Sequence, residues 1–174
     1  MQSFRTELEN PIVEKDIIDL EKKIREFREG KIHDEKFRSL RLARGIYGQR
    51  QPGVQMIRIK LPFGKVSFKQ ILRIADISDE YASSNLHLTT RQDIQIHYVS
   101  LDRTPELWAK LEQDDITLRE ACGNTVRNIT ASPNAGIDPK ELFDVSPYAY
   151  GTFEYLLRNP VNQDMPRKFK IAFS

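Results

Sequence analysis

Residues 86–98 constrain the fold more than any other stretch, because polar and apolar side chains alternate through most of their length. With a period of two, polar residues fall on one side and mainly apolar ones on the other: His87, Thr89, Arg91, Asp93, Gln95 and His97 against Leu86, Leu88, Ile94, Ile96 and Tyr98. The pattern predicts a β-strand with one apolar face. Thr90 and Gln92 interrupt that face, so we expect a bulge or a tight bend at residues 90–92.

The polar side of this stretch has an unusual composition. Two imidazoles and a guanidinium stand in a row, where a solvated face usually carries lysine, glutamate, serine and threonine. Such groups can bind an anion. A strand whose polar side simply faces water is the competing interpretation, because antiparallel sheets often have one wet face. His87 and His97 lie ten residues apart, which on one strand is too far for a local metal pair.

Length, charge and cysteine content exclude several classes of protein. The 174 residues suit one domain, or one and a fraction. The 27 lysines and arginines against 25 aspartates and glutamates give a net charge of +2, too small to indicate a nucleic-acid or membrane partner. The single cysteine, Cys122, excludes an internal disulfide and any cysteine-rich metal site built by this chain alone. Without a secretory pattern or a long apolar run, we expect a cytoplasmic protein.

Residues 1–53 are predicted to form an N-terminal arm of helices and extended chain. Ile17, Leu20 and Ile24 recur at helical spacing, and Gly30 is a plausible stop. A second short helix is expected to begin at Asp34. The arm has no compact core of its own, so we expect it to pack on a larger body.

In residues 54–116, strands and helices are predicted to alternate. Arg58 and Lys60 fall on one side of a predicted strand at residues 54–61. A capping box of Ser67 and Gln70 begins one helix, and Thr104 as a cap followed by Pro105 begins another. With residues 86–98 between them, the order is strand, helix, strand, helix. This order favours an α+β fold, a ferredoxin-like half-domain with helices on one face of the sheet and the other face free.

Residues 117–174 are predicted to begin a second α+β domain. A further capping box at residues 117–120 predicts a helix containing Cys122, which we interpret as a buried core residue rather than a nucleophile. Asp138 and Ser146 are expected to start two more helices. Polar and apolar residues alternate over residues 165–174, as in a β-strand, and the apolar positions continue up to the last residues before Ser174. We therefore expect a truncated part of a longer protein.

Cations recur on the predicted polar faces, and their convergence on one anion is our hypothesis. They are Arg58 with Lys60, Arg91 with His97, Lys168 with Lys170, and Arg127 in a turn-like run. Each charge-assisted hydrogen bond contributes ~1.5 to 3 kcal/mol, so four donors could bind a divalent oxyanion. Alternatively, the lysines and arginines are separate solvated charges, and Asp93 is a local partner of Arg91.

Five runs of residues stand in a fixed order: 45–50 (GIYGQR), 56–62 (MIRIKLP), 86–97 (LHLTTRQDIQIH), 123–128 (GNTVRN) and 166–170 (PRKFK). Together they resemble the N-terminal half of the assimilatory sulfite and nitrite reductases, the sirohaem enzymes, over about residues 38–174. The resemblance implies a ferredoxin-like half-domain followed by the opening of a sirohaem domain. It also implies a whole enzyme that passes electrons through a 4Fe-4S cluster to sirohaem and reduces sulfite to sulfide or nitrite to ammonia.

Carried over residue by residue, the resemblance implies two groups of site residues. The substrate-anion cage falls on Arg58, Arg127, Lys168 and Lys170. Contacts to sirohaem fall on Arg50, Thr89, Arg91, Gln95, His97 and Arg167. The cysteine ligands of the cluster would lie beyond Ser174, because Cys122 does not match them. We therefore expect no turnover by these residues alone, and a ferredoxin or a flavoprotein as the electron donor of the whole enzyme.

One position favours sulfite over nitrite. Nitrite-preferring relatives usually carry asparagine where this chain has Lys170, and a doubly charged anion accounts for the additional cation. Two other classes stay open: a non-catalytic module that binds an anion or a tetrapyrrole, and an RNA-binding sheet, although RNA readers place Phe and Tyr on the open face. We also expect uncovered apolar surface that could drive dimerisation.

Overall fold

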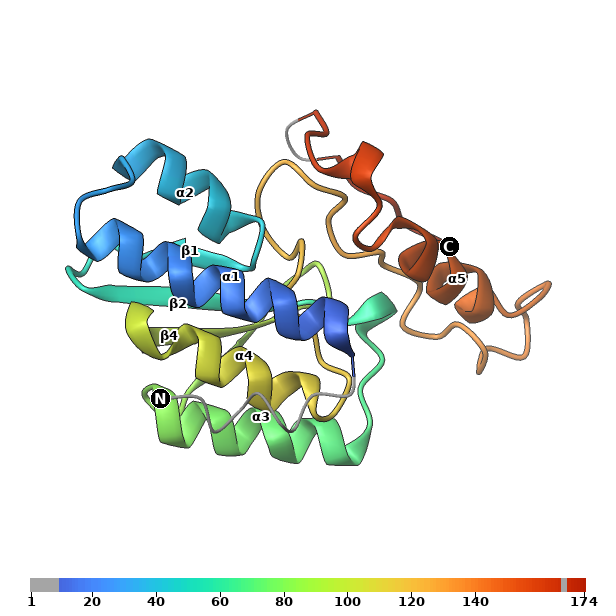
Figure 1. The fold of residues 1–174 in the computed structure, drawn as a ribbon. Helices are drawn as coiled ribbons and strands as arrows, with labels where there is room; N and C mark the ends of the chain where they lie inside the picture. Colours follow the sequence, from blue (N-terminus) through green and yellow to red (C-terminus); the bar gives the residue numbers. More distant parts are fainter. Residues whose placement is uncertain (1–9, 167–168) are drawn as a thin grey trace.

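The computed structural model describes residues 10–166 and 169–174 of the chain. An antiparallel sheet lies at its centre, in the order β1 (Ile46–Gly48), β2 (Val54–Ile59), β4 (Ile94–Ser100) and β3 (Leu86–Leu88). Helices α1 (Pro11–Arg28), α3 (Phe68–Tyr81) and α4 (Thr104–Glu112) cover one face of the sheet, as Figure 1 shows. The predicted α+β fold, with helices gathered on one face, is confirmed.

Two further helices flank this body. The short helix α2 (Asp34–Leu42) packs beside β1, and α5 (Ser146–Leu156) belongs to a smaller part at one end of the sheet (Figure 1). Three 3-10 turns complete the described elements: η1 (Pro62–Gly64), η2 (Leu101–Arg103) and η3 (Pro160–Asn162). No described helix is long and apolar enough to cross a lipid bilayer.

Residues 86–98 form a hairpin, so the prediction of one continuous strand is wrong. Strand β3 turns back on β4, and His87 pairs with Gln95. The turn is held by the hydroxyl of Thr89, which accepts hydrogen bonds from the backbone N–H of Arg91 at 3.2 Å and of Asp93 at 3.1 Å. Gln92 adopts φ +59°. The tight bend expected at residues 90–92 is confirmed.

A β-bulge also lies in β4, in its pairing with β2 and further along the chain than expected. Gln55 pairs with Val99, but Ile57 pairs with Ile96, so two residues of β4 oppose one residue of β2. One of the two, Tyr98, has φ +67°. Its N–H is withdrawn from the ladder and donates to Gln49 Oε1 at 2.6 Å. A bulge of this kind redirects the side chains beside it.

The main apolar core lies between the sheet and its covering helices. Ile17 and Leu20 of α1 and Ile57 of β2 are almost completely buried in it, together with Trp108 of α4. The predicted amphipathic helix in the N-terminal arm is therefore confirmed, and its buried face joins the same core as the sheet. Helix α1 begins after Asn10, whose side chain accepts the N–H of Ile12 at 3.0 Å.

Local capping was predicted correctly at one helix and not at another. In α3, Ser67 and Gln70 make both hydrogen bonds of the capping box. In α4, Thr104 is the first helical residue rather than its cap, and its hydroxyl donates to the carbonyl of Leu101 at 2.7 Å.

Residues 117–145 contain no helix in the structure, which corrects two predictions. The hydroxyl of Thr117 accepts the N–H of Arg119 at 3.1 Å and closes a turn instead of capping a helix. Glu120 and Gly123 have φ +60° and +83°, which an α-helix does not tolerate. Cys122 is buried as expected, but outside any helix. Asp138 likewise caps only a local turn, through the N–H of Lys140 at 2.9 Å.

The C-terminal residues are less regular than predicted. Over residues 169–174 the structure shows an isolated parallel bridge between Thr130 and Ala172 instead of a strand. Ile171 and Phe173 nevertheless pack against a second, smaller core that includes Val126 and Ile129. The expected helix at Ser146 is confirmed as α5.

Candidate anion and cofactor site

The uncovered face of the sheet carries a row of polar side chains across three strands. Arg58 of β2 pairs with Gln95 of β4, which pairs with His87 of β3. With its amide oxygen toward β2, Gln95 accepts hydrogen bonds from Arg58 Nη2 at 2.6 Å and Nε at 3.1 Å. Because Gln95 is neutral, it orients the guanidinium without neutralising its charge.

His87 and His97 lie close together on this face. Their ring centroids are 5.8 Å apart and the rings are inclined by 21°. The hairpin makes this contact, and it corrects the premise that ten residues on one strand keep the two imidazoles too far apart for a local metal pair. Burial lowers the pKa of His97, and His87 lowers it further. Nε2 of His97 is buried and makes no hydrogen bond to any described residue.

Arg58 and Arg127 line one cavity of about 580 Å³. Strand β2 supplies Arg58, and the loop after Cys122 supplies Arg127. Burial lowers the pKa of Arg127, and the neighbouring Arg58 adds to the effect. Among the described residues, neither guanidinium forms an ion pair. Two half-buried cations without a direct ion-pair partner favour an incoming anion.

Helix α2 and strand β1 provide the other walls of this cavity. The additional lining residues are Glu35, Arg38, Ser39, Leu42, Tyr47, Met56, Cys122, Gly123 and Asn124. Sequence reasoning missed Arg38, a third cation at the cavity, because it lies on the polar side of a surface helix and nothing in the pattern distinguishes it from a solvated residue.

Lys60 and Asp93 are buried beside the site rather than exposed. The side chain of Lys60 is 3% exposed, which contradicts its interpretation as a solvated charge, and burial lowers its pKa to about 8. Burial raises the pKa of Asp93 to about 6, although Arg58 and Lys60 oppose the change. Oδ1 of Asp93 has no hydrogen-bond partner within the described chain.

Other predicted site residues hold the protein together or lie apart from the cavity. Arg91 Nη2 donates to the carbonyls of Asn128 at 2.5 Å and Ile171 at 2.7 Å, so it joins the hairpin turn to the C-terminal part. Arg50 and Lys170 are exposed and do not line the cavity. Arg167 and Lys168 lie outside the described residues.

The open face fits an acidic macrocycle better than it fits an iron–sulfur cluster. Its hydrogen-bond donors, Arg58, His87 and His97, are suited to bind carboxylates. Nε2 of His97 has no hydrogen-bond partner among the described residues, so it is free to bind such a group. A 4Fe-4S cluster needs four thiolates, and the chain has one cysteine. Within residues 10–166 and 169–174, no group of three or more His, Cys, Asp or Glu could hold a metal ion.

Two family models match the chain. Residues 47–114 match the nitrite/sulfite reductase ferredoxin-like half domain, and residues 122–174 match the nitrite and sulphite reductase 4Fe-4S domain. The ferredoxin-like character predicted for the sheet and its helices is thereby confirmed.

Curated relatives carry both reductase names. An assimilatory ferredoxin-dependent nitrite reductase of Haloferax mediterranei is 35% identical over 140 residues, which cover 74% of this chain and 24% of that protein. Sulfite reductase [ferredoxin] 1 of Mycolicibacterium paratuberculosis is 32% identical over 119 residues, 68% of this chain and 21% of that protein. The chain thus spans roughly a quarter of the length of these relatives.

A solved structure shows the same fold. The NirA protein of Mycobacterium tuberculosis superposes with a TM-score of 0.76 and 26% sequence identity, over 82% of this chain and 29% of that one.

Proposed function

Because this chain belongs to the nitrite/sulfite reductase family, we propose that it forms part of a sirohaem- and iron–sulfur-dependent reductase that reduces sulfite to sulfide. The observation that carries the proposal is the meeting of Arg58 and Arg127 at one cavity beside the open face of the sheet. Both residues were predicted for the anion cage from sequence.

The arginines bind and orient the oxyanion. Arg58 is fixed by Gln95, so its remaining N–H groups are directed without reorganisation, and Arg127 supplies a second cation from the facing loop. Fixed positive charge stabilises negative charge that develops as the anion is reduced. Lys168 and Lys170 are proposed to complete the cage and to help deliver the protons with which oxygen leaves as water.

Sirohaem, when bound, supplies the iron at which electrons reach the substrate. We propose that Gln95 and His97, on the open face, would hold it by donating hydrogen bonds to its carboxylates. Thr89, Arg91, Arg50 and Arg167 are proposed as further contacts. For Arg91 this requires N–H groups beyond the Nη2 that already binds two carbonyls. The cluster cysteines are proposed to belong to residues outside these 174.

Nitrite is the second candidate substrate. The 35% identity to a nitrite reductase favours it, whereas Lys170 favours sulfite because a divalent anion gains more from an additional cation. The relatives named here depend on ferredoxin, so a ferredoxin is the proposed electron donor and a flavoprotein the alternative. We retain residues 1–53, 54–116 and 117–174 as the proposed divisions of the chain.

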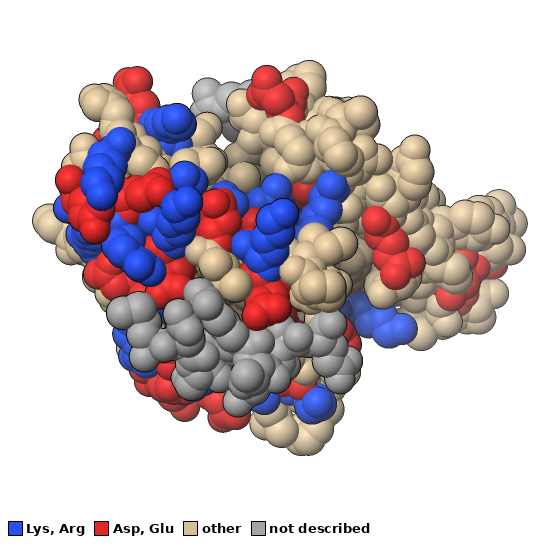
Figure 2. Space-filling model, in the orientation of Figure 1, with Lys and Arg blue, Asp and Glu red and all other residues tan. Residues whose placement is uncertain are grey.

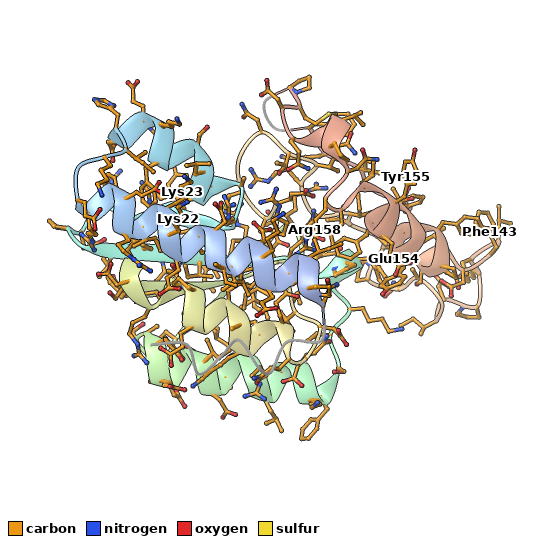
Figure 3. The ribbon with its side chains drawn as sticks, viewed as in Figure 1. Lys22, Lys23, Phe143, Glu154, Tyr155 and Arg158 are labelled. Atoms are coloured by element: carbon orange, nitrogen blue, oxygen red, sulfur yellow. The ribbon has the colours of Figure 1, made fainter. Side chains whose placement is uncertain are left out.

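The C-terminal part exposes apolar side chains that support the proposed dimer. Figure 2 shows charges of both signs over α1 and α2 and few over the α5 region. Leu142 is 98% exposed and Tyr155 75%. Figure 3 shows Phe143 at the outer end of this part, pointing away from the sheet. Light scattering over a range of concentrations tests the dimer, and a monomer throughout would contradict it.

Anion titrations of the ¹⁵N-labelled chain test the proposed site. Sulfite is expected to shift the side-chain Nε–Hε resonances of Arg58 and Arg127, and to do so at lower concentration than nitrite. Lys65 is exposed and does not line the cavity, so Lys65→Met is the control and is expected to leave these anion-induced shifts unchanged. Equal shifts in all arginine resonances would show unspecific binding and reject the site. A visible spectrum of the chain produced with sirohaem tests the cofactor separately.

A further inference from the structure

Lys60 makes its contacts away from solvent, although it lies on the same face of the chain as Arg58, two residues earlier. Its Nζ donates a hydrogen bond to the carbonyl of Val126 at 3.0 Å. It lies 3.7 Å from Glu120 Oε2 and 5.5 Å from the centroid of the Phe153 ring. An ammonium so deeply buried is retained only where it is well paired.

The partner carboxylate is itself fixed from several directions. Glu120 is fully buried in a left-handed backbone conformation, with φ +60°. Its Oε1 accepts the backbone N–H of Arg158 at 2.9 Å and Nε2 of Gln163 at 2.7 Å. Glu120 therefore joins the loop at residues 117–129 to the segment after α5, and Lys60 joins both to the end of β2.

The geometry points to Lys60 as a positioning residue for Arg127. The carbonyl that Lys60 holds belongs to the peptide directly before Arg127, in a loop without helix or strand. We propose that this bond, braced by Glu120, sets the direction in which Arg127 enters the cavity opposite Arg58. The role rests on the proposed function only in so far as Arg127 binds the anion.

Asn128 braces the other side of Arg127. Its side-chain N–H groups donate to the carbonyls of Leu61 at 2.6 Å and Arg91 at 3.1 Å. The backbone at Arg127 is thus tied on one side to Lys60 and on the other to residues that follow β2 and β3. Loss of the Lys60 bond releases one of two fixed points, so Arg127 gains freedom while Arg58 remains oriented by Gln95.

Lys60→Met, which keeps the length of the side chain and removes the ammonium, tests the role. In the chain without anion, the Arg127 Nε–Hε resonance is expected to move or broaden while that of Arg58 stays. Sulfite affinity is expected to fall about tenfold, the loss of roughly one well-made hydrogen bond. Lys65→Met removes the same charge nearby and is expected to change neither resonance.

Two further variants separate positioning from charge and from folding. In an Arg127→Ala background, Lys60→Met is expected to have no additional effect on sulfite affinity; the same tenfold loss there would overturn the proposal. Glu120→Gln preserves the acceptor for Arg158 and Gln163 and loosens Lys60, so it carries the test if Lys60→Met does not fold. An Arg127 resonance unchanged in both variants would also overturn it. If Arg127 responds but the unmutated chain binds no sulfite, the positioning role stands and the proposed function fails.

Discussion

Replacing Asp93 with asparagine is expected to raise the free energy of unfolding at neutral pH but not at acidic pH. Asp93 is 3% exposed and its Oδ1 has no hydrogen-bond partner within the described chain. Burial raises its pKa from 3.8 to about 6, so the native state binds the proton more tightly than the unfolded state. The free energy of unfolding therefore falls as the pH rises from about 4 to about 6, and stays lowered above that.

The magnitude follows from the size of the pKa change. A shift from 3.8 to about 6 corresponds to about 3 kcal/mol as an upper value. Asp93→Asn removes the ionisable group and keeps the shape of the side chain. At neutral pH the free energy of unfolding of the variant is therefore expected to be higher than that of the unmutated chain by up to about that amount. At about pH 3 the difference is expected to be close to zero, because the carboxyl is then largely protonated in both states.

Urea unfolding at the two pH values measures this effect. Trp108 is the single tryptophan, is completely buried and donates to Glu112 Oε1 at 2.6 Å, so its fluorescence reports on the main core. Asp79→Asn, at an exposed position of α3, is the matched control and is expected to be neutral. A stabilisation of equal size at both pH values, or none at neutral pH, would refute the reasoning.

Three further substitutions test other parts of the structure. Gly45→Ala is expected to lower the melting temperature markedly, because Gly45 has φ +71° and a Cβ would lie 2.6 Å from the Leu118 carbonyl oxygen; unchanged melting would contradict this. Asn128→Ala is expected to cost about 1–3 kcal/mol in urea unfolding, since the Leu61 carbonyl loses its buried donor, and a neutral result would remove that role. Lys170→Asn is expected to shift the anion preference toward nitrite in competition titrations, and no shift would remove the main reason for preferring sulfite.

Features that depend on near neighbours were predictable from the sequence. The buried face of α1 follows from the spacing of Ile17, Leu20 and Ile24, and the start of α3 follows from Ser67 and Gln70. The polar face that carries Arg58 and Gln95 was also predicted correctly, although residues 86–98 were predicted as one strand and form two. Residues that pair across β3 and β4 have side chains on the same face of the sheet. The alternation of polar and apolar residues is therefore the same before and after the turn, so the pattern does not reveal the turn.

Features that depend on contacts between distant residues needed the folded chain. The capping pattern at Thr117 predicted a helix, but burial of Glu120 against Lys60 and Gln163 holds that segment in a loop. The same loop brings Arg127 to the cavity that Arg58 lines. Local propensity amounts to a few tenths of a kcal/mol per residue, whereas a buried charge without its partner costs several, so tertiary contacts decided the conformation there.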